Sequence, residues 1–231
     1  MTTSSLPRRW YTAGTNLEVW GEAGTYKAVP YEALPPLPAP RVEDGPFAWL
    51  RGAPVSPHGL DFGDEGEGNE GSFDARLALI VSQASKMGLT VPPTLVAFLG
   101  HPELHSRVPS CTACYLDVPA RLIELPGGEP GRLLRFMNDQ QCCLLWYVHL
   151  EPGGGHSIVC AAPEWIEGAQ GESLEDVTRP RDVEMCAASF EEFIQRFWME
   201  NSLWFAVSKG TPLSDEQKAY AAAAKSSRES N

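Results

Sequence analysis

The sequence has no long apolar run and no surplus of basic residues. No stretch approaches the roughly 18 consecutive apolar residues that a membrane-spanning helix requires. Lysine and arginine number 18 against 30 aspartates and glutamates, which gives a formal net charge of −12. Proteins that bind nucleic acid carry a basic footprint. We therefore expect a protein that neither spans a membrane nor binds nucleic acid.

The start of the chain lacks the apolar core of a secretory signal peptide, because Met1–Pro7 is followed by Arg8 and Arg9. We accordingly expect a cytoplasmic protein. Its six cysteines are then expected to be reduced, since disulfides are rare in the cytosol. The even number of cysteines is therefore no indication of a disulfide framework.

Motifs of the common catalytic sites are also missing. The sequence contains no G-x-S-x-G, no H-E-x-x-H, no P-loop and no G-x-G-x-x-G. Gly153–Gly155 lies between two predicted strands and not before a helix, so it does not predict a phosphate cradle. His149 and His156 flank this turn, as surface histidines often do without a function. We predict no catalytic residue, no bound cofactor, no metal ligand and no enzymatic activity.

Residues 1–71 predict a partly β N-terminal extension at the periphery of the fold. Leu17–Trp20 and Thr25–Val29 flank a glycine-rich turn, a pattern typical of two short strands. Leu34–Pro40 is proline-rich and indicates an extended connector. Asp61–Gly71 is acidic and glycine-rich and lacks the spacing of a calcium-binding EF-hand loop, which favours a solvated linker.

Residues 72–207 predict the main domain, which begins with two helices. One apolar face repeats at helical spacing up to the Met87-Gly88 end; its members are Phe73, Leu77, Ile80, Val81 and Ala84. A shorter helix is expected over Thr94–Leu99, where Pro92 or Pro93 occupies the first turn.

Four strands are expected next: Cys114–Val118, Leu133–Met137, Cys142–Leu150 and His156–Ala161. Their succession along the chain predicts an antiparallel meander. Asn138–Gln141 indicates the turn between the second and third strands, because asparagine and aspartate side chains bond to nearby backbone. Trp146 and Tyr147 must point to opposite faces of their strand. Residues 163–182 are polar and predict a surface loop.

Two capping boxes indicate helices in the C-terminal part of the chain. Ser189 with Glu192 begins a helix whose core face carries aromatic side chains, namely Phe190, Phe193, Phe197 and Trp198, together with Ile194. Within residues 208–231, Ser214 and Gln217 begin a helix over Ser214–Lys225. This helix is alanine-rich, so we expect an exposed appendage that ends in a disordered tail. The whole pattern predicts an α+β protein with helices packed on a mostly antiparallel sheet.

The order of these motifs resembles the SUKH superfamily, which includes yeast cell-wall-assembly regulators and bacterial immunity proteins. The matching motifs cover residues 72–207 and are LTVPPTLVAFL around Val91–Leu99, FMNDQ at Phe136–Gln140, the Trp146-Tyr147 strand, the Gly155–Val159 hairpin and SFEEFI at Ser189–Ile194. The resemblance implies a SUKH-like α+β fold. It also implies a protein-binding role, most specifically the neutralisation of a polymorphic toxin by occlusion.

The acidic composition agrees with that expectation, because toxins of the nuclease type are usually basic and opposite charge speeds encounter. The expected partner is therefore another protein, a basic toxin domain, and the expected binding surface is an exposed sheet face or edge together with acidic loops.

An alternative function rests on His101, His105, Cys111 and Cys114. Two imidazoles and a C-x-x-C within a short stretch would supply four ligands of the kind that zinc prefers, in a zinc-stabilised or regulatory protein. Pro102 argues against a continuous helix bearing both histidines. A redox role of the C-x-x-C is less favoured, because the motif precedes a strand and does not begin a helix. Asp139 with its neighbouring glutamines is interpreted as a self-capped turn in preference to a catalytic acid.

Overall fold

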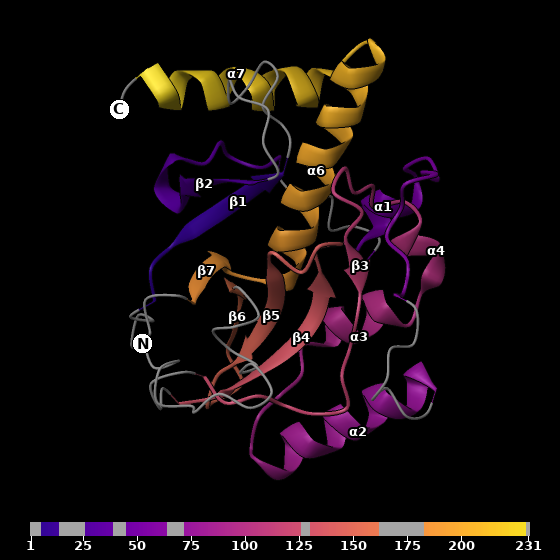
Figure 1. Cartoon of the computed structure of the whole chain (residues 1–231), viewed down its shortest axis with the longest axis vertical. Coiled ribbons are helices and arrows are strands. Elements are labelled where there is room, and N and C mark those ends of the chain that lie inside the picture. Colours follow the sequence, from indigo (N-terminus) through magenta and orange to yellow (C-terminus); the bar gives the residue numbers. More distant parts are fainter. Residues whose placement is uncertain are drawn as a thin grey trace.

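The computed structural model describes residues 6–13, 26–38, 45–63, 72–125, 130–161 and 183–229. These residues form the predicted α+β fold, with a five-stranded antiparallel sheet in the order β3-β4-β5-β6-β7 and a separate two-stranded hairpin, β1-β2 (Figure 1). The strands of the large sheet are β3 (Tyr115–Leu116), β4 (Arg132–Asn138), β5 (Leu145–Leu150), β6 (His156–Ala161) and β7 (Glu184–Ala187), and those of the hairpin are β1 (Arg9–Ala13) and β2 (Tyr26–Pro30).

Helices cover this sheet and extend from it. They are α1 (Ala48–Arg51), α2 (Phe73–Lys86), α3 (Pro93–Leu99), α4 (Pro102–His105), α6 (Phe190–Lys209) and α7 (Asp215–Glu229), with a short 3-10 turn at Tyr31–Ala33. Figure 1 shows α7 lying across the end of α6, far from α2. None of the helices in these described ranges is long and apolar enough to cross a membrane.

Both faces of the central strands are buried. Every residue of β5 is buried, and only the first residue of β6 is partly exposed. Trp146 belongs to the main core beside α6, whereas its neighbour Tyr147 belongs to a second apolar cluster on the opposite face with Leu133 and Val159. The expectation of an exposed sheet face is therefore wrong, because each face has its own core.

The edges of the sheet are also occupied by chain segments that the sequence analysis placed in the N-terminal extension. At the β7 edge, the backbone N–H of Met185 donates to the carbonyl of Pro7 at 2.8 Å. At the β3 edge, the N–H of Leu116 donates to the carbonyl of Asp61 at 2.8 Å, and Gly63 donates to the carbonyl of Leu116 at 3.1 Å. These pairings satisfy edge groups that would otherwise be open to another strand.

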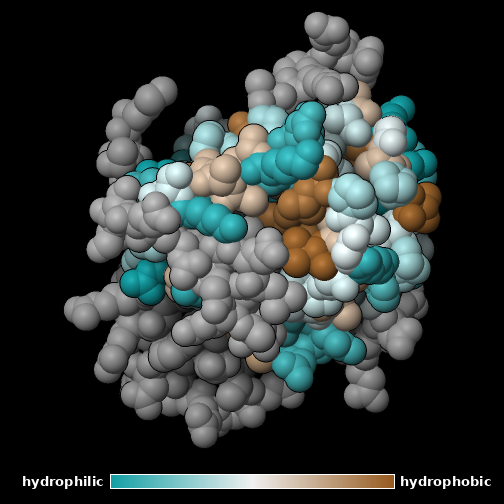
Figure 2. Space-filling view, turned by 90° about the horizontal axis from the view of Figure 1, so that it is seen from above, coloured by the Kyte–Doolittle hydropathy of each residue, from teal (hydrophilic) through white to brown (hydrophobic). Residues whose placement is uncertain are grey.

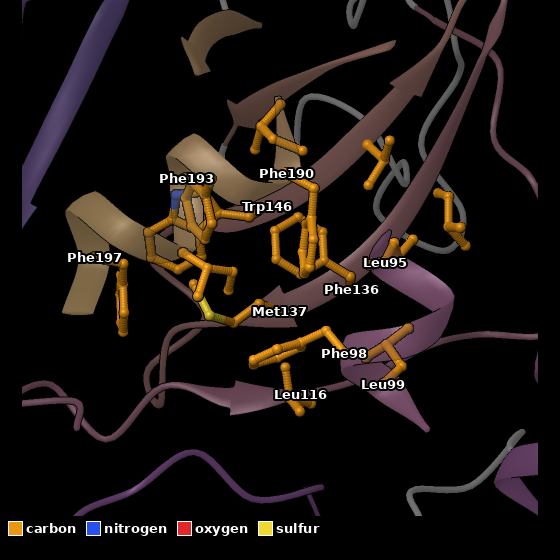
Figure 3. Packing of buried hydrophobic residues seen from close by; sticks show 14 of the residues in the cluster. Leu95, Phe98, Leu99, Leu116, Phe136, Met137, Trp146, Phe190, Phe193 and Phe197 are labelled. Atoms are coloured by element: carbon orange, nitrogen blue, oxygen red, sulfur yellow. The ribbon is translucent and has the colours of Figure 1, made fainter. Parts of the chain in front are cut away.

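The main core lies between the sheet and the apolar faces of α3 and α6. Figure 3 shows Phe190, Phe193 and Phe197 of α6 converging on Phe136 and Trp146 of the strands. Ser189 caps α6 by accepting from the N–H of Glu192 at 3.1 Å, as predicted. The Glu192 carboxylate binds the N–H of Ala188 at 3.1 Å, one residue before the expected partner.

The described N-terminal residues share this core. Trp10, Phe47 and Leu50 are buried in the same cluster as α3 and α6, and Trp10 lies 5.5 Å from Phe193, centroid to centroid. Packing therefore shows no boundary at residue 72, and these residues are not a peripheral layer. Of the two strands expected here, Thr25–Val29 corresponds to β2, while Leu17–Trp20 lies outside the described residues.

Most predicted elements of the central region are present with small shifts. The α2 helix ends at Lys86, followed by Gly88 with a φ of +70°, and buries Leu77, Ile80 and Ala84. Val81, expected on the buried face, is 40% exposed. The strand expected from Cys142 begins only at Leu145, so Cys142 and Cys143 lie exposed in the turn and do not fill the core.

The expectation for the last helix is wrong in one respect. Ser214 and Gln217 form the predicted reciprocal capping box, at 2.9 and 3.1 Å. The helix is not an exposed appendage, because Tyr220 and Ala224 are buried against Met199 and Leu203 of α6. The tyrosine hydroxyl also donates to the carboxylate of Glu200 at 2.7 Å. The polar loop expected at 163–182 lies outside the described residues.

Candidate functional site

The residues of the zinc hypothesis have separate structural roles. His105 is buried, and its Nε2 lies 2.7 Å from the carbonyl of Phe98, so this nitrogen carries the proton and donates. Its ring packs on Phe62 and Phe98, and burial lowers the pKa of the imidazole. His101 is exposed and pairs with Glu103 at 3.1 Å.

No group of three or more histidine, cysteine, aspartate or glutamate side chains within the described ranges could hold a metal ion. Those ranges include all four residues of the zinc hypothesis, namely His101, His105, Cys111 and Cys114. The geometry therefore does not support the zinc alternative, since these side chains do not converge on one point.

Cys111 and Cys114 also lack the environment of a reactive C-x-x-C. Burial raises the pKa of Cys111 to about 12 and also raises that of Cys114. A thiolate is the nucleophile in disulfide exchange. Both thiols therefore stay protonated near neutral pH, and the redox interpretation is disfavoured.

Cys114 belongs to a polar cluster that joins the N-terminal hairpin to the sheet. The hydroxyl of Tyr26 donates to Oδ1 of Asp139 at 2.7 Å and lies 3.1 Å from the hydroxyl of Thr112 and 3.6 Å from Sγ of Cys114. Ser110 accepts from the N–H of Cys114 at 2.8 Å. The cluster is partly buried and its members bond to one another, which indicates a structural role.

Asp139 caps its own turn, as predicted, by accepting from the N–H of Gln141 at 3.1 Å and of Cys143 at 3.4 Å. It is 1% exposed. The sequence pattern of the turn did not reveal its long-range partner Tyr26. The aspartate therefore fixes both the local turn and the position of β2.

His149 and His156 do not approach each other as a functional pair. Nε2 of His149 lies 3.1 Å from the carbonyl of Pro130. Nε2 of His156 accepts from the backbone N–H of Phe190, at the start of α6, at 3.4 Å. Burial lowers the pKa of His156. Each histidine holds a different connection in place.

A second buried cluster surrounds Glu200 on α6. Its carboxylate accepts from Nε1 of Trp10 at 2.8 Å and from the hydroxyl of Tyr220 at 2.7 Å. Burial raises the pKa of Glu200, and these hydrogen bonds together with the charge of Arg196 oppose the rise. Nη1 of Arg196 in turn donates to the carbonyl of Pro35 at 3.0 Å. The cluster ties β1, the proline-rich connector and α7 to one helix.

The charges of the chain are distributed unevenly. Five stretches, which we call the acidic segments, contain 15 acidic and three basic residues and carry the whole net charge of −12; they are 14–25, 39–44, 64–71, 126–129 and 162–182. Removing these from the totals of 30 and 18 leaves 15 acidic and 15 basic residues. The remaining residues, which we call the framework, therefore have a formal net charge of zero.

An apolar groove of about 390 Å³ lies between α6, the start of α7 and two loops. Its lining consists of prolines, other apolar side chains and hydroxyl-bearing residues. The two charged residues, Arg107 and Lys209, are both cations. The lining residues are Pro54, Val55, Ser56, Pro57, Arg107, Pro109, Trp198, Ser202, Phe205, Ala206, Lys209, Thr211, Ser214 and Gln217. No motif in the sequence indicated this groove, because its residues come from three separate stretches, 54–57, 107–109 and 198–217.

Comparison of the chain with protein-family models, with curated proteins and with solved structures finds no match.

Proposed function

We propose that this chain is a protein-binding module that acts as an immunity protein and neutralises a basic toxin domain by covering it. The observation that carries this proposal is the formal net charge of −12, all of which comes from the five stretches of the sequence that we call the acidic segments. A net charge of one sign attracts an oppositely charged partner and raises its association rate.

Exposed apolar side chains on the helix that follows one acidic segment in the sequence support the same proposal. Segment 64–71 contains four acidic residues and leads directly into α2. On α2 and its C-cap, Leu79, Val81 and Met87 are 46%, 40% and 53% exposed. Protein interfaces combine an apolar centre with a polar rim. In this proposal exposed apolar side chains of α2 and its C-cap supply apolar contacts, and the preceding carboxylates supply the charge.

The fold gives further support. The helices α2 and α3, the meander β4-β5-β6 and the helix α6 follow one another in the order of the motifs that resemble the SUKH superfamily. Because the sheet faces and the described edges are covered, the proposed contact uses α2 and the acidic segments in place of the sheet.

Co-expression with the product of the adjacent gene tests the proposal. The neighbouring product alone is expected to arrest growth, and this chain is expected to restore growth and to copurify with that product. Failure to restore growth, or a neighbouring gene whose product is harmless, would count against an immunity role.

Two variants with the same change of charge sharpen this test. D64N/E65Q/E67Q removes three charges from an acidic segment, whereas E32Q/E103Q/E124Q removes three exposed charges from the framework. Rescue is expected to weaken in the first variant and to persist in the second. Equal weakening in both would show that position of the charge does not matter.

The surface of α2 is tested separately. L79N/M87N replaces two exposed apolar side chains and is expected to weaken binding of the toxin domain while stability changes by less than about 0.5 kcal/mol. The matched control is K86Q, which changes an exposed neighbour on the same helix. Binding unchanged in L79N/M87N would remove α2 from the proposed interface.

A further inference from the structure

The groove beside α6 and α7 differs from the rest of the chain in the sign of its charge. Acidic residues outnumber basic ones by 30 to 18 over the whole sequence. The groove nevertheless contains arginine and lysine and no carboxylate among its lining residues. It therefore favours an anion within a protein that would repel anions at long range.

The walls of the groove are held in place by contacts outside it. Phe205 is stacked on His58, with ring centroids 4.8 Å apart and an angle of 9° between the planes. Trp198 is packed edge to face against Trp49 at 5.1 Å. Both aromatic side chains are thus fixed before any ligand binds, and a preformed site loses less entropy on binding.

The loop that forms the opposite wall is fixed to the backbone beneath it. The N–H of Ser56 donates to the carbonyl of Ser106 at 2.8 Å, and Nη1 of Arg107 donates to the carbonyl of Ala53. A side chain at Gly59 would place its Cβ 2.5 Å from the backbone of Ser106, so only glycine permits this close approach. These backbone contacts therefore fix the loop that forms this wall of the groove.

Arg107 lines the groove and brings a positive charge to it. Its Nε is buried and its Nη1 donates to the carbonyl of Ala53. Arg107 therefore attracts an anion in the groove through the charge of its guanidinium. The ammonium of Lys209 lies 5.1 Å from the centre of the Phe205 ring, beside the same groove. Two cationic side chains and two aromatic side chains therefore line the same groove.

We propose that this groove binds a small organic carboxylate that carries an aromatic ring. The ring packs among Trp198, Phe205 and the prolines, and the carboxylate meets Arg107 and Lys209. A volume of about 390 Å³ is at the small end of the range for ligand pockets, roughly 300–1,000 Å³, which favours a small molecule over an extended peptide. This site is separate from the surface in the proposed function and does not depend on it. Figure 2 shows, on the end of the molecule seen from above, apolar residues in brown bordered by hydrophilic residues in teal.

The test compares two probes of equal size, naphthalene-2-carboxylate and its uncharged amide, naphthalene-2-carboxamide. Titration calorimetry on the full chain is expected to show the carboxylate binding at least about tenfold more tightly than the amide, the size expected for a charge-assisted hydrogen bond. The indole signal of Trp198 in NMR spectra is expected to shift on binding.

Two variants and one control assign the charge preference to the groove. R107M and K209M are each expected to reduce the preference for the carboxylate, and K209M changes an exposed side chain, so it tests the site even if R107M does not fold. K86M, on the exposed surface of α2, is expected to leave binding unchanged.

Three outcomes would overturn the proposal. The first is no binding of either probe up to about 1 mM. The second is equal affinity for the carboxylate and the amide, or an equal effect of K86M and K209M. The third is a much tighter complex with a short peptide that ends in phenylalanine, such as acetyl-Gly-Phe, which would identify a peptide site in place of a small-molecule site.

Discussion

The framework and the acidic segments differ sharply in how they use charge. The framework has 15 acidic and 15 basic residues and buries several of them in specific hydrogen bonds, of which those of Asp139 and Glu200 are the clearest. The acidic segments hold 15 acidic and only three basic residues. Buried charges therefore take part in packing in the framework, whereas the net charge of the sequence comes from the acidic segments, which we propose attract the partner.

The first 71 residues show that this division does not follow the order of the chain. Trp10 and Tyr26 belong to the framework and each donates a hydrogen bond to a buried carboxylate. Segments 14–25, 39–44 and 64–71 belong to the acidic set. A region that the composition predicted to be one peripheral extension thus alternates between the two classes.

Replacing Trp10 with alanine tests the framework where the largest effect is expected. The side chain is 2% exposed, packs on Phe193 and donates to Glu200. Loss of a buried tryptophan costs about 3–5 kcal/mol of stability, measured by urea denaturation. The control V55A changes a side chain that is 62% exposed and is expected to cost less than about 0.5 kcal/mol. If W10A lowered the free energy of unfolding by less than about 1 kcal/mol, the N-terminal hairpin would not be part of the core.

The second prediction concerns the hydroxyl of Tyr26. Y26F leaves Oδ1 of the buried Asp139 without its donor, and such a loss costs about 1–3 kcal/mol. The control is Y31F, whose hydroxyl binds Glu192 at 2.5 Å, because that carboxylate is 24% exposed and water can replace the donor. A larger effect of Y31F than of Y26F on the free energy of unfolding would contradict the assignment of Asp139 as an anchor.

The third prediction is a pH dependence that arises from Glu200. Burial raises its pKa in the folded protein above the ordinary value of 4.5, so the folded state holds this proton more tightly than the unfolded state. Its contribution to stability is therefore most favourable below the ordinary pKa and decreases as the pH rises through the raised pKa. The stability of the wild type relative to E200Q is expected to fall over that window.

Urea denaturation of both proteins from about pH 4 to about pH 8 measures this difference. The control is E103Q, which changes an exposed side chain, and its free energy of unfolding should vary with pH as that of the wild type does. A difference between wild type and E200Q that grows with pH would mean that the carboxylate is stabilised in its charged form, contrary to its buried setting.

The smallest effect on stability is expected from the acidic segments. D64N/E65Q/E67Q should change the free energy of unfolding by less than about 0.5 kcal/mol, the range of most surface substitutions. Thermal and urea denaturation measure this directly. A decrease in the free energy of unfolding above about 1 kcal/mol would contradict the distinction between framework and acidic segments, because these carboxylates would then contribute to folding.

Local signals in the sequence predicted much of the fold. The capping residues Ser189 and Ser214 predicted where α6 and α7 begin, and the run His156–Ala161 predicted the bounds of β6. The expected end of the last helix at Lys225 is wrong, because α7 continues to Glu229. The strands β1 and β7 were missed, since each is short and contains charged residues, Arg9 and Glu184. Their place is determined by partners distant in the sequence.

Long-range contacts also explain what the sequence did not reveal about the candidate sites. The alanine-rich pattern around Tyr220 predicted exposure, but this face is buried against Met199 and Leu203, and the tyrosine hydroxyl binds Glu200. The groove combines Val55, Arg107, Phe205 and Gln217, which are far apart in the chain. Conversely, His101, His105, Cys111 and Cys114 are close in sequence and do not converge in space.

The most direct test of the central claim is the rate at which the chain associates with the product of the adjacent gene, which we propose is its toxin partner. The account predicts that D64N/E65Q/E67Q associates more slowly than the wild type at low salt, that E32Q/E103Q/E124Q does so to a smaller extent, and that these differences shrink at high salt. Equal association rates for all three proteins at low salt would contradict the claim that the acidic segments recruit the partner.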